Sequence, residues 1–413
     1  MPEHVTPEGK AHPVLFLILF LPLGITNGYV VVTLAYLLAQ NGVSVAGVAG
    51  LVALSLLPQT WKVLWAPLVD TTLTLKRWFL LSAIVTGALM IATAAVTPVS
   101  ANLALIEALC VGFSLTSSFN CMAADSLMAH ATAPEEKGRA GGWSQAGNLG
   151  GSGLGGGVGL WLAQHLSSYG WVSGAVLGGV CILSALATLW LKEPEAEHRA
   201  TNYLTSLVNV GRECWDVLST RLGFLAFFIM LLPIGVGAAQ NLWSAVANDW
   251  HASADAVALV NGALGGVIAM FGCIAGGIVC DKMDRKLAYC IFGIALAVVA
   301  ALMALAPRTE LMFVTFTCVY AFVMGFCYAA FGAVVLEAIG AGAAATKYNL
   351  LAGISNAPII YQTMIDGWGH DRWGASGLLY VEALCGVAAV AFYFIVAAVT
   401  RGLFSRDAPA ATA

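Results

Sequence analysis

The sequence predicts an all-α polytopic membrane protein in which twelve transmembrane helices form two pseudo-symmetric bundles of six. First, 60% of the 413 residues are hydrophobic and only 10% are charged, whereas soluble domains carry about 25% charged residues. Second, apolar runs near the roughly 20 residues that a bilayer-spanning helix needs recur along the whole chain. Third, motifs of the first half reappear in the second. These observations exclude a soluble globular enzyme and do not fit the alternating strands of outer-membrane barrels.

Short polar breaks separate the apolar runs and define the expected spans. They lie at residues 13–38, 44–66, 78–96, 101–129, 139–164, 170–191, 222–247, 254–280, 287–306, 311–339, 346–366 and 376–400. The longest polar stretch, which is rich in charged residues, lies between the sixth and seventh spans. We therefore expect a first bundle at residues 1–191, a cytoplasmic linker at residues 192–221 and a second bundle at residues 222–413.

The basic residues set the orientation. With a cytoplasmic N-terminus, fifteen of the 18 Lys and Arg residues fall on the cytoplasmic side, Lys62 lies inside the second span, and only Arg308 and Arg372 face outward. Cytoplasmic loops of membrane proteins carry this excess of positive charge. We therefore expect both termini in the cytoplasm. The first apolar run is longer than the core of a signal peptide and lacks a small-residue cleavage site after it, so it is expected to be retained as span one.

The two halves of the chain repeat each other. Three motifs recur on equivalent spans, which a chance match would not do. They are LPLG at residues 21–24 and LPIG at 232–235, Asp70 and Asp281 at the same offset of 211 residues, and Asn148 and Asn356 at an offset of 208. Two six-helix halves in the same orientation are the simplest account, and such repeats are typical of secondary transporters.

The distribution of charges and cysteines gives no indication of a nucleic-acid, metal or cofactor partner. The net charge of −4 and the scattered basic residues give no indication of nucleic-acid binding. The ten cysteines lie almost all inside apolar runs, with no CxxC pair and no histidine at metal-ligand spacing. We therefore expect neither a metal site nor a cofactor.

The loop after the eighth span carries a gate-like pattern. Residues 276–286 read GGIVCDKMDRK, in which an aspartate ends a helix and basic residues follow a tight turn. This pattern resembles the signature loop of the major facilitator superfamily. The resemblance implies a major facilitator fold and gating roles for Asp281, Lys282, Arg285 and Lys286. The first-half copy keeps Asp70, Lys76 and Arg77, but has a proline before the aspartate and a longer, threonine-rich turn.

The departure in the first-half copy is itself informative. Residues 62–70, KVLWAPLVD, resemble the second-span motif of the muropeptide permease and acetyl-coenzyme A transporter (AmpG-like) branch of the superfamily. Residues 347–351, KYNLL, look like a tyrosine-containing motif of that branch, with Lys347 where glutamine is usual. The resemblance implies transport of a muropeptide, with siderophores and acyl-coenzyme A as the alternative cargoes.

Charged side chains inside spans are costly and are functional candidates by default. Asp125 lies in span four and Glu337 near the end of span ten, and both spans line the central path in the geometry that the resemblance implies. One of these carboxylates could bind and release a coupling proton. Alternatively, they form a static inner gate with basic partners. The candidate partners are Lys62, Lys137, Arg139 and Lys347.

Uncharged polar side chains are candidates for a substrate site. They follow the two proline kinks or share one face of the fifth and eleventh spans, positions where kinked helices expose hydrogen-bonding groups to cargo. Hydrogen bonding between helices is the alternative role. The candidates are Asn27, Tyr29, Gln145, Asn148, Gln240, Asn241, Trp243, Asn349 and Asn356.

Residues 150–153, GGSG, match the nucleophile pattern of intramembrane serine proteases and keep a serine hydrolase as a remote alternative. A serine nucleophile needs a histidine base, yet all seven histidines fall in tails, loops or span ends. The sequence is thus read as a non-enzymatic secondary transporter.

The combined prediction is a proton-coupled importer of a polar solute that works by alternating access. Proton-coupled export remains an open alternative. The expected partners are a small-molecule substrate, protons and the lipid bilayer. We expect a monomer in the bacterial inner membrane.

Overall fold

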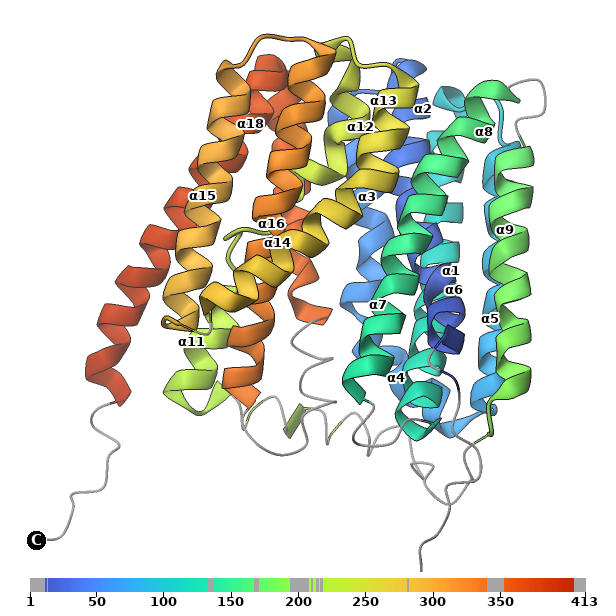
Figure 1. Cartoon of the computed structure of the whole chain (residues 1–413), viewed down its shortest axis with the longest axis horizontal. Coiled ribbons are helices and arrows are strands. Elements are labelled where there is room, and N and C mark those ends of the chain that lie inside the picture. The colour runs from blue at the N-terminus through green and yellow to red at the C-terminus, as the bar shows by residue number, and fades with distance from the viewer. Residues whose placement is uncertain are drawn as a thin grey trace, which may run out of the picture. The chain divides into compact units, whose positions relative to one another are not determined.

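The structure is a computed structural model that describes residues 12, 14–131, 137–166, 171–193, 208, 211–212, 215, 218–280, 282–339 and 353–404. The described residues are helices joined by short turns (Figure 1). Eight of these helices are long and apolar enough to cross a membrane. The predicted all-α membrane fold is thereby confirmed.

The chain divides into two compact units. Unit 1 contains residues 1–43, 54–206 and 253–266, and unit 2 contains residues 44–53, 207–252 and 267–413. Each half of the sequence thus contributes a short segment to the unit that holds most of the other half. The division of the chain at the 192–221 linker stays a prediction.

Unit 1 is built from the first six expected spans and a piece of the eighth. Its elements are α1 (Val14–Gly28), η1 (Tyr29–Leu34), α2 (Ala35–Gln40), α4 (Lys62–Thr71), α5 (Leu75–Ala95), η2 (Ser100–Asn102), α6 (Leu103–Ala131), α7 (Lys137–Gly153), η4 (Leu154–Val158), α8 (Gly159–His165), α9 (Val172–Ser184), η6 (Ala185–Trp190), α13 (Ala254–Val257) and η10 (Ala258–Leu264). The α3 helix (Val45–Thr60) begins in unit 2 and ends in unit 1.

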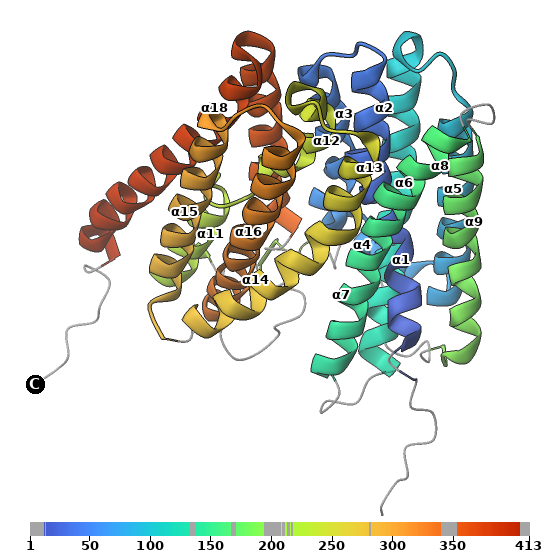
Figure 2. The same cartoon turned by 45° about the horizontal axis from the view of Figure 1, so that its top comes forward.

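Unit 2 is built from the remaining spans. Its elements are α11 (Arg221–Met230), η8 (Ala238–Leu242), α12 (Trp243–Val246), η9 (Ala247–Trp250), α14 (Gly265–Cys280), α15 (Arg285–Leu305), α16 (Glu310–Ile339) and α18 (Asn356–Phe404), with the first two residues of α14 in unit 1. The turned view in Figure 2 shows the bend of α18 most clearly. The observed helices begin and end within a few residues of most expected spans.

Glycines set the close approach of α1 and α7. A methyl group added at Gly24 or Gly28 of α1 would meet the backbone of Asn148 or Ser152 on α7, and one added at Gly147 would meet Leu17 of α1. Lipid gives helices little hydrophobic reason to associate, so small residues that allow tight van der Waals packing hold them together. The many glycines of the expected fifth span therefore have a packing role.

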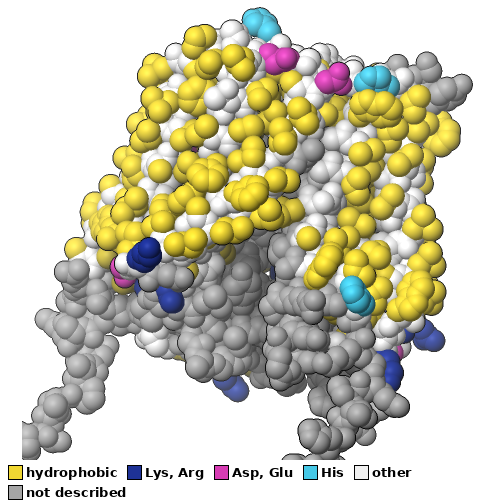
Figure 3. Space-filling model, viewed as in Figure 1, with side chains coloured by type: hydrophobic (Ala, Val, Ile, Leu, Met, Phe, Trp, Pro, Cys, Tyr) yellow, Lys and Arg dark blue, Asp and Glu magenta, His cyan; other side chains and the backbone are white. Residues whose placement is uncertain are grey.

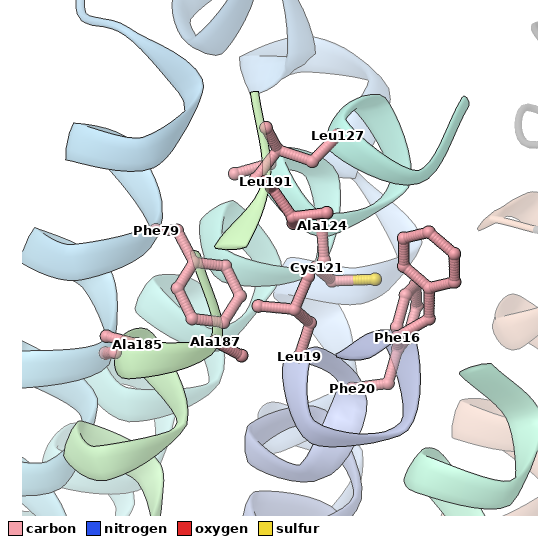
Figure 4. Packing of buried hydrophobic residues seen from close by; sticks show 12 residues of the cluster. Phe16, Leu19, Phe20, Phe79, Cys121, Ala124, Leu127, Ala185, Ala187 and Leu191 are labelled. Atoms are coloured by element: carbon pink, nitrogen blue, oxygen red, sulfur yellow. The ribbon is translucent and has the colours of Figure 1, made fainter. Parts of the chain in front are cut away.

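A second contact region in unit 1 is made by larger apolar side chains. One cluster of buried apolar side chains contains Phe16 and Leu19 of α1, Phe79 of α5, Cys121 of α6 and Leu191 after η6 (Figure 4). All five are at most 6% exposed. The exterior is also apolar, and hydrophobic side chains cover the helices on the face in Figure 3, as a lipid-facing surface requires.

Wide π-helical turns interrupt three helices of unit 1, at η1, η4 and η10. Such turns free backbone carbonyl groups, which must find other donors in a membrane. The hydroxyl of Thr33 in η1 lies 2.8 Å from the carbonyl oxygen of Gly155 and 3.2 Å from that of Gly156, both in η4. The Thr33 side chain thus supplies a hydrogen-bond donor to carbonyl groups that the π-helical turn frees.

The α18 helix contains two of the expected spans. Residues 367–374 are expected to form an outward loop, but the chain stays helical there except at Gly374, where φ is 65° and ψ is −166°. The left-handed φ is accessible to glycine at little cost. A methyl group at Gly369 would meet Gly377 and Val381, so the segments on either side of Gly374 pack against each other as a helical hairpin.

Candidate functional site

The expected seventh span, in unit 2, is not a continuous helix. The α11 helix ends at Met230, and helical geometry resumes only at Ala238. Between them, Gly235 and Gly237 have left-handed φ values of 61° and 67°. Non-helical backbone at membrane depth occurs where it is buried in protein or lines a cavity. The break therefore marks a candidate site.

The local sequence explains the break. Pro233 has no N–H to donate to a helical ladder, and the two glycines adopt a conformation that other residues resist. Bulky neighbours occupy the space beside them, because a methyl group at Gly235 would meet Cys327 and one at Gly237 would meet Met324, both on α16. The phenolic O–H of Tyr361 on α18 donates to the carbonyl oxygen of Leu231 (2.7 Å) and satisfies a backbone group freed by the break.

Three predicted substrate residues follow the break. Asn241 in η8 donates from Nδ2 to Oγ1 of Thr363 on α18 (3.1 Å). Trp243, the first residue of α12, is fully buried, and its indole ring stands edge-on to the ring of Tyr320 on α16, with centroids 5.3 Å apart. Gln240 is half-buried in η8. The break thus brings amide and indole groups into the interior of unit 2.

An acidic cluster of Tyr320, Gln362, Asp366 and Glu382 lies next to these residues. The Tyr320 O–H donates to Oε1 of Glu382 (2.6 Å), and Gln362 Nε2 donates to Oδ1 of Asp366 (2.8 Å). Asp366 is fully buried and Glu382 is 7% exposed. The two carboxyl groups are close enough to interact electrostatically.

Several buried polar atoms around the break have no hydrogen-bond partner. Native proteins pair nearly all such atoms, so each exception needs an explanation. The atoms here are Gln240 Oε1, Trp243 Nε1, Gln362 Oε1, Asp366 Oδ2 and Glu382 Oε2. Of these, Gln240 Oε1 and Trp243 Nε1 supply an acceptor and a donor, which is what a polar ligand would engage.

In unit 1, the structure brings Lys62 and Asp125 together. Lys62 begins α4, Asp125 lies on α6, and the charge of Lys62 acts on the Asp125 carboxyl group. The thiol of Cys121 donates to Oδ2 of Asp125 at 3.6 Å. This arrangement is compatible with the predicted gate and with the predicted proton site.

The substrate candidates of unit 1 have different environments. Tyr29 is 1% exposed and packs against Phe113 on α6, with ring centroids 6.4 Å apart, whereas Asn27 is exposed. Asn148 is half-buried on α7, and its carbonyl group faces Gly24. Tyr29 therefore has an interior packing environment. In unit 2, Asn356 is half-buried at the start of α18.

The gating candidates lie at helix starts. Lys76 and Arg77 are in the first turn of α5, where Glu193 accepts from the backbone N–H groups of Leu75 (2.7 Å) and Lys76 (3.2 Å). Arg285 and Lys286 begin α15, and Asp284 caps that helix by accepting from Leu287 N–H (2.8 Å). Lys282 lies in the turn before it and is exposed.

The remaining candidates are placed only in part. Asp281, Lys347 and Asn349 lie outside the described residues. Asp70, Arg139, Gln145 and Glu337 belong to described helices, which places them on α4, α7, α7 and α16, respectively.

A further polar group lies near Gly374. His370 Nε2 is 2.7 Å from Oδ2 of Asp249, and Oδ1 of Asp371 accepts from the backbone N–H of Ala46 at the start of α3 (3.3 Å). The Arg308 guanidinium stacks on Trp250, 4.0 Å from the ring centroid. Burial lowers the pKa of Arg308, although arginine stays charged in proteins.

Sequence reasoning missed Tyr320, Gln362, Asp366 and Glu382. A signal was available for the two acids. Glu382 is the one charged residue inside the expected twelfth span, and Asp366 ends the eleventh. Intramembrane carboxylates are rare and functional by default. Their proximity could not be inferred, because it depends on the turn at Gly374.

Comparisons with known proteins match this architecture. The fold is similar to that of the nucleoside transporter NupG, with a TM-score of 0.70 at 13% identity, covering 92% of this chain and 98% of that one. It is similar to the D-xylose-proton symporter, with a TM-score of 0.66 at 12% identity and coverage of 92% and 95%. It is also similar to a bacterial homolog of the human lysosomal transporter Spinster in an inward-facing, unoccupied conformation, with a TM-score of 0.71 at 17% identity and coverage of 97% and 98%.

These identities are low and bear on the fold alone. A search of curated proteins gives no match. At the level of families, residues 14–360 match the Major Facilitator Superfamily. This match covers most of the chain and agrees with the helices, the repeat and the gate-like loop, so the chain belongs to the major facilitator superfamily.

Proposed function

We propose that this protein is a proton-coupled secondary transporter that imports a polar solute, such as a muropeptide, by alternating access in the bacterial inner membrane. The observation that carries this proposal is the break in the seventh span. There, Gln240 Oε1 and Trp243 Nε1 are buried without partners, an acceptor and a donor next to irregular backbone. A solute rich in hydroxyl and amide groups would pair with both.

The comparisons favour a polar cargo. Two proteins of similar fold are described as a nucleoside transporter and a D-xylose-proton symporter. Nucleosides and sugars are polar, and the D-xylose transporter is described as a proton symporter. From these two proteins we propose for this chain only a polar cargo and the proton as the driving ion.

The choice of a muropeptide rests on residues 62–70, whose Lys62, Trp65, Pro67 and Asp70 resemble the AmpG-like branch. Lys62 and Asp125, which the structure brings together, are proposed to close the cytoplasmic gate or to carry the proton. Siderophore transport, acyl-coenzyme A transport and proton-coupled export are the competing proposals.

Ligand-induced stabilisation of the full chain in detergent tests the cargo. A ligand at a hundred times its Kd stabilises the folded state by about 2.7 kcal/mol. We expect a disaccharide-peptide muropeptide to raise the melting temperature, and a hydroxamate siderophore and acetyl-coenzyme A to leave it unchanged. Gln240→Ala should abolish the shift, whereas Gln164→Ala, at an exposed position of α8, should preserve it. A shift with either of the other compounds instead would reject the muropeptide assignment.

Transport itself is tested in proteoliposomes. An imposed pH gradient, acidic outside, should drive accumulation of the radiolabelled muropeptide. Asp125→Asn should abolish gradient-driven uptake if Asp125 carries the proton, and Ser152→Ala should leave uptake unchanged. Loss of a peptide-cleaving activity in Ser152→Ala, with uptake preserved, would instead support the intramembrane hydrolase.

The predicted symmetry of the substrate site has its own test. Asn148→Ala and Asn356→Ala, combined in one chain, should weaken muropeptide binding by about tenfold if each amide donates one hydrogen bond to the ligand. Unchanged affinity would reject the symmetric site and leave the seventh-span residues as the binding groups. Isothermal titration of the purified variant against the muropeptide measures the effect.

A further inference from the structure

Asp366 and Glu382 occupy equivalent positions on the two arms of the α18 hairpin. Each lies eight residues from Gly374, where the helix turns back. Because an α-helix rises about 1.5 Å per residue, both carboxyl groups lie about 12 Å from the turn. Equal depth on packed arms explains why two acids far apart in the sequence interact.

The surroundings of the pair are well defined. The titratable groups that face it are Tyr320 and Cys327 on α16 and Cys385 on α18 itself. Gln362 adds a neutral amide, and the neighbouring η8 carries only uncharged side chains. In the described part of the chain, no Lys, Arg or His forms an ion pair with either acid. The known contacts therefore supply no compensating positive charge.

The two carboxyl groups of the pair have fewer hydrogen-bond donors than they have oxygen atoms. Four carboxyl oxygens receive two donated hydrogen bonds, one from Tyr320 and one from Gln362. Asp366 Oδ2 and Glu382 Oε2 remain buried without a donor, and the nearby Gln362 Oε1 is a further unpaired acceptor. Acceptors are in excess, so the missing component is a hydrogen-bond donor.

The charge of the pair also indicates that a proton is bound to it. Two ionised carboxylates would place two negative charges in a low-dielectric interior, which costs several kcal/mol per unpaired ion. One proton bound to the pair removes one charge and supplies the donor that the unpaired oxygens lack. Buried carboxyl pairs in other proteins share a proton for this reason.

We propose that Asp366 and Glu382 together bind one exchangeable proton and form the site at which proton movement is coupled to transport. The proton comes from water, forms an O–H bond on one carboxyl group, and returns to water when the site opens to the other side. This inference rests on the proposed proton coupling and assigns the coupling to this pair in place of Asp125.

The contacts also connect the pair to the candidate substrate site. Tyr320 donates to Glu382, and its ring contacts Trp243, which follows the break in the seventh span. A change in the protonation of Glu382 changes what the Tyr320 hydroxyl binds. The ring of Tyr320 then transmits that change to Trp243. Tyr320 is thus a positioning residue between proton and solute.

Infrared spectroscopy of the purified full chain tests the proton directly, without any solute. The C=O stretch of a protonated carboxylic acid is separate from the bands of carboxylates. We expect such a band at about pH 7, where exposed acids are ionised, and its loss in Asp366→Asn/Glu382→Gln. The control Asp255→Asn/Glu310→Gln changes two exposed acids and should keep the band. An identical band in wild type and in the first variant would overturn the proposal.

Transport in proteoliposomes tests the coupling. Glu382→Gln should lose accumulation of the labelled muropeptide driven by a pH gradient, while solute-for-solute counterflow at equal pH continues. Accumulation equal to that of wild type would overturn the assignment. Accumulation driven by a sodium gradient at equal pH would also overturn it, because the pair would then bind a metal cation.

The two proposals fail in different ways. If wild-type protein does not take up the muropeptide at all, the proposed cargo is wrong, and the infrared measurement still decides whether the pair holds a proton. If wild type shows gradient-driven uptake and Glu382→Gln does too, the proposed function stands and the site assignment falls. A melting temperature within a few degrees of that of wild type checks that Glu382→Gln is folded.

Discussion

The α1 helix and the chain after α11 contain copies of one motif, LPLG and LPIG, but only the second copy interrupts its helix. In α1, Pro22 lies inside a continuous helix, and the hydroxyl of Thr26 lies 3.0 Å from the Pro22 carbonyl oxygen. In the second copy, Gly237 occupies the position equivalent to Thr26 and adopts a left-handed φ. The difference shows that a proline alone does not break a transmembrane helix here.

Tertiary packing accounts for the rest of the difference. Gly24 and Gly28 of α1 lie against the backbone of α7, which leaves no room for α1 to bend. The nearest neighbours of Gly235 and Gly237 are instead side chains of α16, Cys327 and Met324, and the backbone of Gly293 on α15 lies next to Gly235. A backbone-to-backbone contact fixes a straight helix, whereas side-chain neighbours allow the chain to turn between them.

The largest effect is expected from Gly24→Ala. The added methyl group would coincide with the Asn148 carbonyl group, so α1 and α7 would have to separate. Overpacking costs roughly 1–3 kcal/mol, and a rigid backbone neighbour places this case at the upper end. The melting temperature in detergent should fall sharply. Gly150→Ala, where nothing lies within 4 Å, is the matched control and should change little. Equal melting temperatures would contradict the proposed α1–α7 contact.

Gly237→Ala should have the next largest effect. A left-handed backbone costs an L-residue about 1–2 kcal/mol, and the methyl group also meets Met324. Thermal unfolding should show a loss of stability of this size. Adding Met324→Ala to the same chain should recover only the part of that loss that the clash causes. Gly42→Ala isolates the backbone cost, because Gly42 at the end of α2 has a left-handed φ of 81° with nothing within 4 Å. Full recovery in the double variant would mean that backbone strain is negligible.

Thr26→Gly tests whether the glycine itself makes the break. It places in α1 the residue that the second copy has at Gly237. We expect a cost of about 1 kcal/mol from helix propensity but no break, because α7 still holds Gly24 and Gly28. Spin labels at the two ends of the first span should report an unchanged distance. A shortened distance would show that sequence, and not packing, keeps α1 straight.

The smallest effect is expected from Asn241→Ala. It removes the hydrogen bond to Thr363 that joins η8 to α18. Interhelical hydrogen bonds in membrane proteins contribute about 0.6 kcal/mol on average, so unfolding should change only slightly. Solute binding should weaken more than stability if Asn241 contacts the cargo. If stability falls and solute binding does not change, Asn241 has a purely structural role.

Much of the architecture could be predicted from the sequence. Apolar runs and polar breaks locate the spans because a backbone that faces lipid must satisfy its own hydrogen bonds, which a helix does. The repeated LPLG and LPIG motifs also indicate where a kink can occur, and Gln240, Asn241 and Trp243 lie beside the one that forms. Which copy breaks could not be predicted, because the outcome depends on the partner helix and not on the motif.

The acidic cluster was missed for a related reason. The rule that selected Asp125 and Glu337 also applies to Glu382, the one charged residue inside the expected twelfth span, but nothing in the sequence pairs it with Asp366. Residues 367–374 also look like a loop, which hides the fact that Asp366 and Glu382 are at equal distances from one turn. Spatial pairing across a hairpin requires knowing which residue adopts the left-handed conformation, and Gly374 is one of several glycines nearby.

The turn at Gly374 also constrains how this region tolerates changes in length. One inserted residue in either arm would rotate everything beyond it by about 100° and shift it by about 1.5 Å. Asp366 and Glu382 would then no longer share one face, even though every side chain was still present. Homologues are therefore expected to vary freely in the identity of exposed residues between these two acids, but to keep the number of residues on each arm.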